Sequence, residues 1–302
     1  MQETEAEIRK PNPGNRTASE ALLELYLARN GYPVFEHEPH VEGKNRKPDY
    51  RLPFGGSSVF LEVKEFGEPI GVFCDGTTQN DPYAPLRDRI DRARKKFQEY
   101  KDSSCSLVLA NPHGAFVQLD AWAIHGAMLG NVGFQVPVGA TVHADMPIRT
   151  VFLGSGRMTD YQRRNTFNTT VSSIIVLCRY PFENTLQELA AKQRERELGR
   201  ELTLDELLEL RCPNVRDHEC KLGRELTLDE MDDMIEHSRS DTAEVGNPVR
   251  LVVHENPFAR LPLSRELFCG PFDERWGAEE GYMRRVFIGD AVRDIEARLH
   301  AS

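Results

Sequence analysis

Apolar residues recur with helical spacing in two stretches of the chain, residues 19–30 and 86–101. The first stretch follows a polar, proline-rich leader and ends at Gly31, a residue type that commonly terminates helices. We therefore predict an amphipathic helix in each stretch. The apolar face of the second helix consists of Leu86, Ile90, Ala93 and Phe97.

Four extended segments accompany these helices. They are YPVFEHE (32–38), PDYRLPF (48–54), VFLEVKEF (59–66) and SLVLAN (106–111). Only the turn residues 55–58 (GGSS) separate the second segment from the third, so a β-hairpin is expected there. The order of helix, three strands, helix and strand predicts an α/β fold with a mixed central β-sheet flanked by helices.

The pattern is weaker after residue 111. A helix is predicted over residues 121–130, and apolar stretches at 134–139, 149–154, 172–178 and 250–258 predict strands. We expect these strands to extend or flank the same sheet.

Composition places the chain among globular proteins. It has 302 residues, of which 39% are hydrophobic, and no apolar run reaches the roughly 18 residues that a membrane span requires. The N-terminus lacks the hydrophobic region of a signal peptide, and six scattered cysteines read as reduced, buried thiols. We therefore expect a cytoplasmic protein that makes no membrane contact.

Most of the net charge of −10 belongs to one segment. Residues 184–245 hold 17 acidic and nine basic residues, a net of −8, which leaves −2 for the rest of the chain. The predicted organisation is a leader (1–16), a core (17–183), an acidic helical insert (184–245) and a C-terminal segment that packs on the core (246–302).

The acidic insert contains the sequence LGRELTLDE twice, at 198–206 and at 222–230. In each copy a threonine precedes a glutamate by three positions, Thr203 with Glu206 and Thr227 with Glu230, which is the signature of a capping box. We expect two short helices joined by a turn. The insert either binds a protein partner or is a solvated appendage that was duplicated and tolerated.

The third extended segment combines an apolar face with a polar one. Because side chains of a strand alternate between faces, Val59, Leu61 and Val63 should point to one side. Phe60, Glu62 and Lys64 should project together to the other side. Asp49, at the start of the partner strand, can lie near Glu62. Two neighbouring carboxylates repel each other and favour a hard divalent cation, so Mg²⁺ fits this pair and Mn²⁺ can substitute.

These residues resemble a known superfamily. Pro48-Asp49 followed by Glu62-Val63-Lys64 is similar to the motif of the PD-(D/E)xK, or restriction-endonuclease-like, nucleases. The resemblance covers about residues 18–111. It implies a mixed sheet flanked by helices and metal-dependent hydrolysis of phosphodiester bonds, in DNA more than in RNA, with Asp49, Glu62 and Lys64 as catalytic residues.

The resemblance also implies further site residues. Such nucleases use the backbone carbonyl of the middle motif residue, here Val63, as a metal ligand, and often a glutamate of the first helix, here Glu20, with Glu24 as its competitor. Many members carry a glutamine or lysine, and then a tyrosine, on the helix after the motif. Lys96 takes the catalytic role of the former here, and Tyr100 corresponds to the latter.

Basic residues near the motif are expected to contact the nucleic acid. The nucleic-acid-binding set is Lys47, Arg89, Arg92, Lys96 and Tyr100, of which the last three are predicted to form one helical stripe. Lysine and arginine contacts to phosphates give affinity and salt dependence rather than sequence choice. The alternative for these residues is an ordinary charged helix face.

Other interpretations remain open from the sequence. A PD and an ExK also occur together as a surface salt bridge on a strand, and a nuclease fold can serve as an inactive, nucleic-acid-binding or partner-recruiting scaffold. Within the insert, Cys212, His218, Cys220 and His237 could bind zinc, although their spacing matches no familiar finger. The sequence also leaves a homodimer open. Prokaryotic defence and mobile-element processing are both compatible with such a nuclease.

Overall fold

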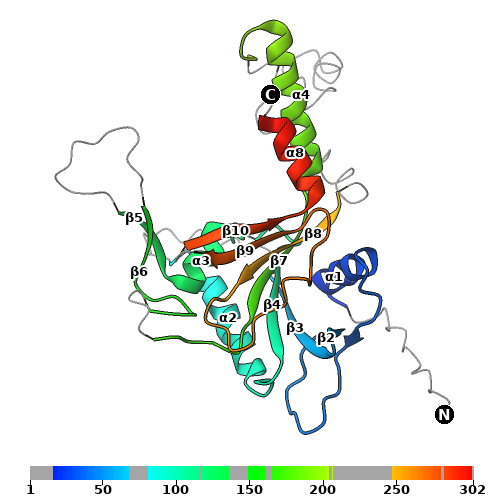
Figure 1. The fold of residues 1–302 in the computed structure, drawn as a ribbon, viewed down its shortest axis with the longest axis vertical. Coiled ribbons are helices and arrows are strands. Elements are labelled where there is room, and N and C mark those ends of the chain that lie inside the picture. The colour runs from blue at the N-terminus through cyan, green and yellow to red at the C-terminus, as the bar shows by residue number, and fades with distance from the viewer. Residues whose placement is uncertain are drawn as a thin grey trace.

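The computed structural model describes residues 16–67, 81–115, 117–135, 149–160, 165–203, 206, 247–279 and 282–300. In these parts the chain forms an α/β structure around an eight-stranded mixed β-sheet (Figure 1). The predicted fold class, a mixed central sheet with flanking helices, is therefore confirmed. No helix in the described part is long and apolar enough to cross a membrane.

The large sheet places strands from both ends of the chain side by side. In spatial order its members are β1 (Glu36–His37), β2 (Tyr50–Phe54), β3 (Ser57–Glu65), β4 (Ser104–Ala110), β7 (Ser173–Arg179), β8 (Val249–Glu255), β9 (Glu274–Glu279) and β10 (Tyr282–Ile288). The β2–β3 hairpin is antiparallel, whereas β3, β4 and β7 run parallel to one another. The strands β8, β9 and β10 come from the C-terminal segment, and the sequence predicted only the first of them.

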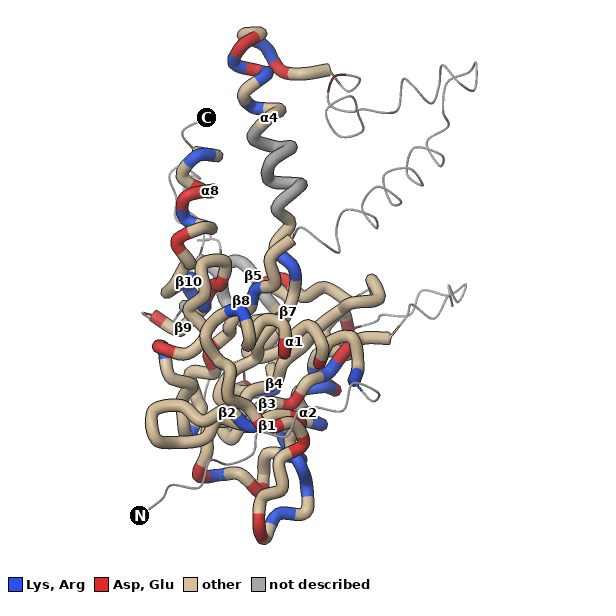
Figure 2. The backbone as a smooth tube through the Cα atoms, turned by 90° about the vertical axis from the view of Figure 1, so that its right-hand side faces the viewer, with Lys and Arg blue, Asp and Glu red and all other residues tan. Residues whose placement is uncertain are grey.

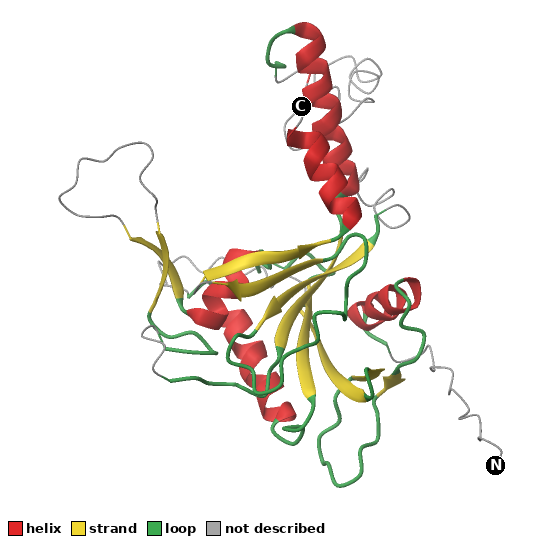
Figure 3. Cartoon of the chain, in the orientation of Figure 1, coloured by secondary structure: helices red, strands yellow, loops and turns green. Residues whose placement is uncertain are grey.

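Helices cover both faces of the sheet (Figures 1 and 3). One face packs on α1 (Ala18–Arg29), and the opposite face packs on α2 (Ala84–Phe97) and α3 (Ala121–Leu129). The alternation predicted for β3 is confirmed, since Leu61 and Val63 pack with α1 while Phe60 packs with α2. The polar residues Glu62 and Lys64 therefore lie on the α2 face.

Two predicted strands do not join the large sheet. The strands β5 (Asn131–Gln135) and β6 (Arg149–Leu153) pair with each other in a separate two-stranded sheet, beside α3 in Figure 1. Of the two expected arrangements, extension of the main sheet is wrong for these strands, which instead lie beside it. Residues 136–139 lie outside the described part.

Two further boundaries differ from the prediction. The first strand has only two residues, because residues 32–35 lie outside any strand. It ends at His37, where Glu38 adopts a left-handed conformation (φ 46°) and Pro39, which cannot donate a backbone hydrogen bond, follows. Helix α2 ends at Phe97 instead of continuing to residue 101. Tyr100 consequently lies beyond the helix and does not extend a stripe of Arg92 and Lys96.

The predicted acidic insert begins with a long helix, α4 (Phe182–Leu198), that contacts α8 (Asp290–His300) and projects with it away from the sheet (Figure 1). Figure 2 shows charges of both signs along α8 and the outer end of α4. In the first repeat copy the capping box of Thr203 and Glu206 forms as predicted. The second copy and the four candidate zinc ligands lie outside the described residues.

Candidate active site

Asp49 is fixed by the backbone of the neighbouring strand. Its amide donates to the Leu61 carbonyl (3.0 Å), one step beyond the Tyr50–Leu61 pair of the hairpin, so its side chain lies across from Glu62. One carboxylate oxygen, Oδ2, accepts the Val63 amide at 2.7 Å. The hairpin register thus brings Asp49 to Glu62, as the short turn predicted.

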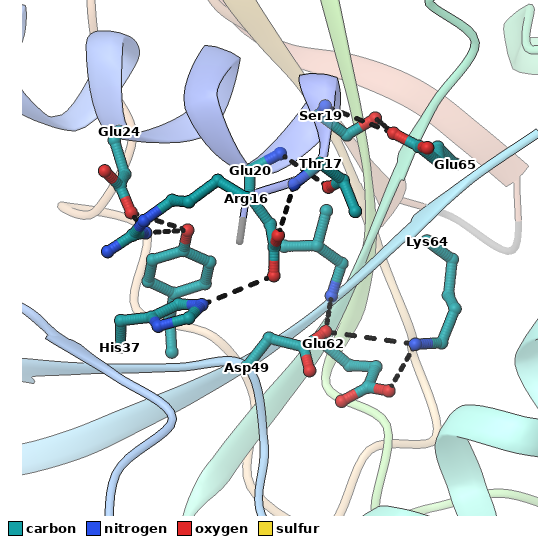
Figure 4. A network of polar contacts seen from close by, with 12 residues as sticks. Arg16, Thr17, Ser19, Glu20, Glu24, His37, Asp49, Glu62, Lys64 and Glu65 are labelled. Atoms are coloured by element: carbon teal, nitrogen blue, oxygen red, sulfur yellow. Dashed lines mark hydrogen bonds and ion pairs between the residues drawn. The ribbon is translucent and has the colours of Figure 1, made fainter. Parts of the chain in front are cut away.

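Glu62 is the most deeply buried group of the site, with 2% of its side chain exposed. Its Oε1 lies 2.7 Å from the Lys64 ammonium, and its Oε2 lies 2.5 Å from that of Lys96. Lys96 also donates to Asp49 Oδ1 (3.2 Å), and Lys64 lies 3.9 Å from Asp49 Oδ2. Two carboxylates and two ammonium groups therefore face one another between β2, β3 and the last turn of α2, where Figure 4 shows Asp49, Glu62 and Lys64 together.

The electrostatics of the cluster are set by burial and by these ion pairs. Burial raises the pKa of the Glu62 carboxyl, the Asp49 charge raises it further, and the two lysines oppose both effects. For Lys96, burial works to lower the pKa, but the charges of Glu62 and Asp49 hold it above its ordinary value. Lys96 therefore stays cationic as long as the carboxylates are ionised.

Glu20 lies on the α1 side of β3, opposite Glu62 and Lys64 (Figure 4). It closes the capping box of α1 by accepting the Thr17 amide (2.8 Å), and its other oxygen contacts His37 Nε2 at 3.4 Å. Burial works to raise the pKa of Glu20, but its bonds to Thr17 and His37 lower it overall. The Thr-Ala-Ser-Glu signal of this capping box was present in the sequence and was missed.

The competing glutamate is also engaged on the α1 side. Glu24 forms an ion pair with Arg16 and accepts the Tyr50 hydroxyl at 2.7 Å. Within the described part of the chain, neither Glu20 nor Glu24 joins Asp49 and Glu62 in a group of three or more side chains that could hold a metal. The structure thus brings together Asp49, Glu62, Lys64 and Lys96. The two α1 glutamates, Glu20 and Glu24, contact other residues instead.

The residues expected to bind nucleic acid differ in their exposure. Lys47 is exposed, and Arg92 is 61% exposed although it pairs with Asp88. Arg89 lies over the Phe66 ring, 5.5 Å from its centroid, with 24% of its side chain exposed. Tyr100 is only 3% exposed and donates its hydroxyl to the Arg46 carbonyl, so it has no surface to offer a nucleic acid.

The loop before Asp49 is anchored on the end of α2, which the sequence did not indicate. Glu99 accepts the Asn45 amide at 2.7 Å, and the Arg46 guanidinium donates to the Lys95 carbonyl. The Tyr100 bond to Arg46 completes this anchor. Because the contacts join residues about 50 positions apart, no local pattern could have revealed them.

The donor set at the site suits a hard cation. Asp49 and Glu62 offer oxygen ligands, and the buried Glu62 Oε2 has only the Lys96 ammonium, 2.5 Å away, as its neighbour of opposite charge among the described residues. The described part of the chain contains no group of three or more His, Cys, Asp or Glu side chains placed to hold a metal. A bound ion would therefore draw on these two carboxylates, backbone oxygen and water.

The comparisons with known proteins do not assign the chain to a family. No family model, no curated protein and no solved structure matches the chain. The functional argument consequently rests on the geometry of Asp49, Glu62, Lys64 and Lys96.

Proposed function

We propose that the protein is a metal-dependent nuclease that hydrolyses phosphodiester bonds, in DNA more than in RNA. The observation that supports this proposal best is the convergence of Asp49 and Glu62 from adjacent strands with the ammonium of Lys64 beside both. The hairpin, the parallel strand β4 and the flanking helices α1 and α2 have the order expected of a PD-(D/E)xK core.

Each residue of the cluster has a role that follows from its position. Asp49 and Glu62 would hold Mg²⁺, which when bound supplies polarisation of the phosphoryl oxygen and a more acidic water. Lys64 is held by Glu62 with 31% of its side chain exposed, so its ammonium can reach a substrate phosphate. There it orients the attacking water or stabilises the charge that develops on phosphorus.

The exposed cations around the site would bind the substrate backbone. Lys47 follows the anchored loop directly before Asp49, and Arg92 lies one turn before Lys96 on α2. Contacts of this type weaken as salt increases and carry no base preference. We leave Tyr100 out of this surface because its side chain is buried.

The test is cleavage by the full chain of plasmid, single-stranded DNA and RNA, each with Mg²⁺, Mn²⁺ or EDTA. We expect cutting that requires a divalent ion and that falls by a factor on the order of 100 or more in Lys64→Ala and Glu62→Gln. Glu65→Gln is the matched control, because Glu65 is the next carboxylate of β3 but bonds to Ser19 of α1. Equal activity in Lys64→Ala and the wild type would exclude this site as the catalytic centre.

A partner-recruiting scaffold is the second candidate. Helices α4 and α8 project from the sheet, and Lys192 of α4 donates to the Leu299 carbonyl, which fixes the pair outside the core (Figure 1). If the folded protein cleaves none of the substrates, with or without a divalent ion, this result would favour the scaffold function over the nuclease. Deletion of the insert would then abolish partner binding and leave the core folded.

A further inference from the structure

We infer that the Lys96 ammonium holds the place of the divalent cation in the metal-free protein, so that metal binding must expel Lys96 from the carboxylates. The inference rests on the proposed function, since it concerns the same metal site. It assigns Lys96 a regulatory exchange instead of a fixed place in the catalytic centre.

The argument begins with the four carboxylate oxygens of the site. The Val63 amide donates to Asp49 Oδ2 at 2.7 Å, and the Lys64 ammonium lies 2.7 Å from Glu62 Oε1. The two oxygens that remain are Asp49 Oδ1 and Glu62 Oε2. Lys96 contacts both of them, at 3.2 and 2.5 Å, and so bridges the pair that is left for a metal.

The contact between Lys96 and Glu62 is a short, buried ion pair. Glu62 Oε2 is buried, and the Lys96 ammonium lies 2.5 Å from it. A hard divalent cation takes carboxylate oxygens as ligands and carries twice the charge of an ammonium. Such an ion can therefore compete with Lys96 for this oxygen.

Charge balance shows that one lysine should leave, and the contacts of Lys96 with the two remaining oxygens single it out. With two carboxylates and two ammonium groups the cluster is neutral, and a retained divalent ion would give it a charge of +2 in a half-buried place. Expulsion of Lys96 reduces this to +1, which the single negative charge of a phosphodiester neutralises. Lys96 extends from the last turn of α2 with 25% of its side chain exposed, so it can swing outward and bind a neighbouring phosphate.

Lys96→Met tests the exchange, because methionine keeps an unbranched stem and removes the charge. Calorimetric titration with Mg²⁺, without nucleic acid, should give a dissociation constant at least about tenfold lower than that of the wild type. Lys95→Met, the exposed neighbour on α2, should bind Mg²⁺ as the wild type does, and Glu62→Gln should lose binding. Lys96→Gln provides the same comparison if the methionine variant folds poorly.

Thermal unfolding supplies a second readout. In EDTA the midpoint of Lys96→Met should lie below that of the wild type, because Glu62 and Asp49 lose a counterion, and saturating Mg²⁺ should reduce or reverse the difference. Lys95→Met should follow the wild type in both conditions. A deficit of Lys96→Met that Mg²⁺ leaves unchanged would overturn the inference, because it would mark Lys96 as a purely structural partner.

The outcomes separate this inference from the proposed function. Equal or weaker Mg²⁺ binding by Lys96→Met overturns the exchange while the nuclease assignment stands on its own assay. Tighter Mg²⁺ binding in a protein that cleaves no nucleic acid supports the exchange and overturns the nuclease. Absence of Mg²⁺ binding in the wild type and in Lys96→Met overturns the exchange, and if divalent-dependent cleavage is also absent it overturns both.

Discussion

Asp49 has a structural and an electrostatic role at the same time. One oxygen accepts the Val63 amide, which ties the entry of β2 to β3, and the other faces the Lys96 ammonium. A side chain with these two roles can be dissected by substitution, because the hydrogen bond and the charge can be removed separately.

Asp49→Asn keeps an oxygen that can accept the Val63 amide but removes the negative charge. We expect nuclease activity to fall by a factor on the order of 100 or more while the thermal midpoint stays near that of the wild type. Asp49→Ala should lose activity and also about 1–3 kcal/mol of unfolding free energy, because the amide is left without its partner. Cleavage by Asp49→Asn at the wild-type rate would contradict a metal-binding role for Asp49.

At the scale of elements, the start of α1 is secured twice. Thr17 and Glu20 form a reciprocal capping box, and Ser19 donates its hydroxyl and its amide to Glu65 at the end of β3. The second contact attaches the first helical turn to the strand that carries Glu62 and Lys64. Helix α1 is thus positioned against the site from the opposite face of the sheet.

Thr17→Ala should lower the free energy of unfolding by about 1 kcal/mol, because it removes the side-chain oxygen that accepts the Glu20 amide. Urea unfolding monitored by circular dichroism measures this change. Thr17→Ser retains the oxygen and should unfold close to the wild type. Equal stability of the alanine and serine variants would show that the capping box contributes nothing in this context.

At the scale of the whole molecule, the C-terminal segment makes side-chain contacts with the N-terminal half. Asp273 accepts the Tyr26 hydroxyl of α1 and the Leu251 amide of β8. On the other face, His254 of β8 contacts His125 of α3, with their nitrogens 3.1 Å apart, and Trp276 of β9 packs against both rings. Segments more than 100 residues apart are therefore joined on both faces of the sheet.

The histidine pair makes stability depend on pH. Burial lowers the pKa of His125 to about 4, with a small opposing effect from Asp120, and burial together with His125 lowers the pKa of His254. The unfolded chain, with histidine pKa values near about 6.5, binds more protons, so the folded state loses stability as the pH falls below that value. Between pH 7 and 5 we expect a loss of about 2 kcal/mol for each of the two histidines, or about 4 kcal/mol for the pair.

Urea unfolding at a series of pH values tests this dependence. His254→Gln should reduce the slope between pH 7 and 5 by about half, because it removes one of the two histidines that stay neutral in the folded protein. His40→Gln, at an exposed histidine, should leave the slope unchanged. A slope that is the same in all three proteins would assign the pH dependence to other groups.

The sequence by itself determined the features that depend on neighbouring residues. The two-residue period of β3 placed Glu62 and Lys64 on one face, and the glycine-rich turn predicted the hairpin that carries Asp49. The register, in which only Gly55 and Gly56 form the turn and Asp49 lies across from Glu62, was decided by the structure. These local rules sufficed for the α/β class and for the centre of the candidate site.

Only the tertiary structure decided the contacts between distant segments. It placed Lys96 on the two free carboxylate oxygens, put Glu20 on the far side of β3, and buried Tyr100 under the loop that it anchors. It also added β9 and β10 to the sheet and kept β5 and β6 apart from it. Such pairings are set by packing between elements, and periodicity along one element carries no information about which partner lies across from it.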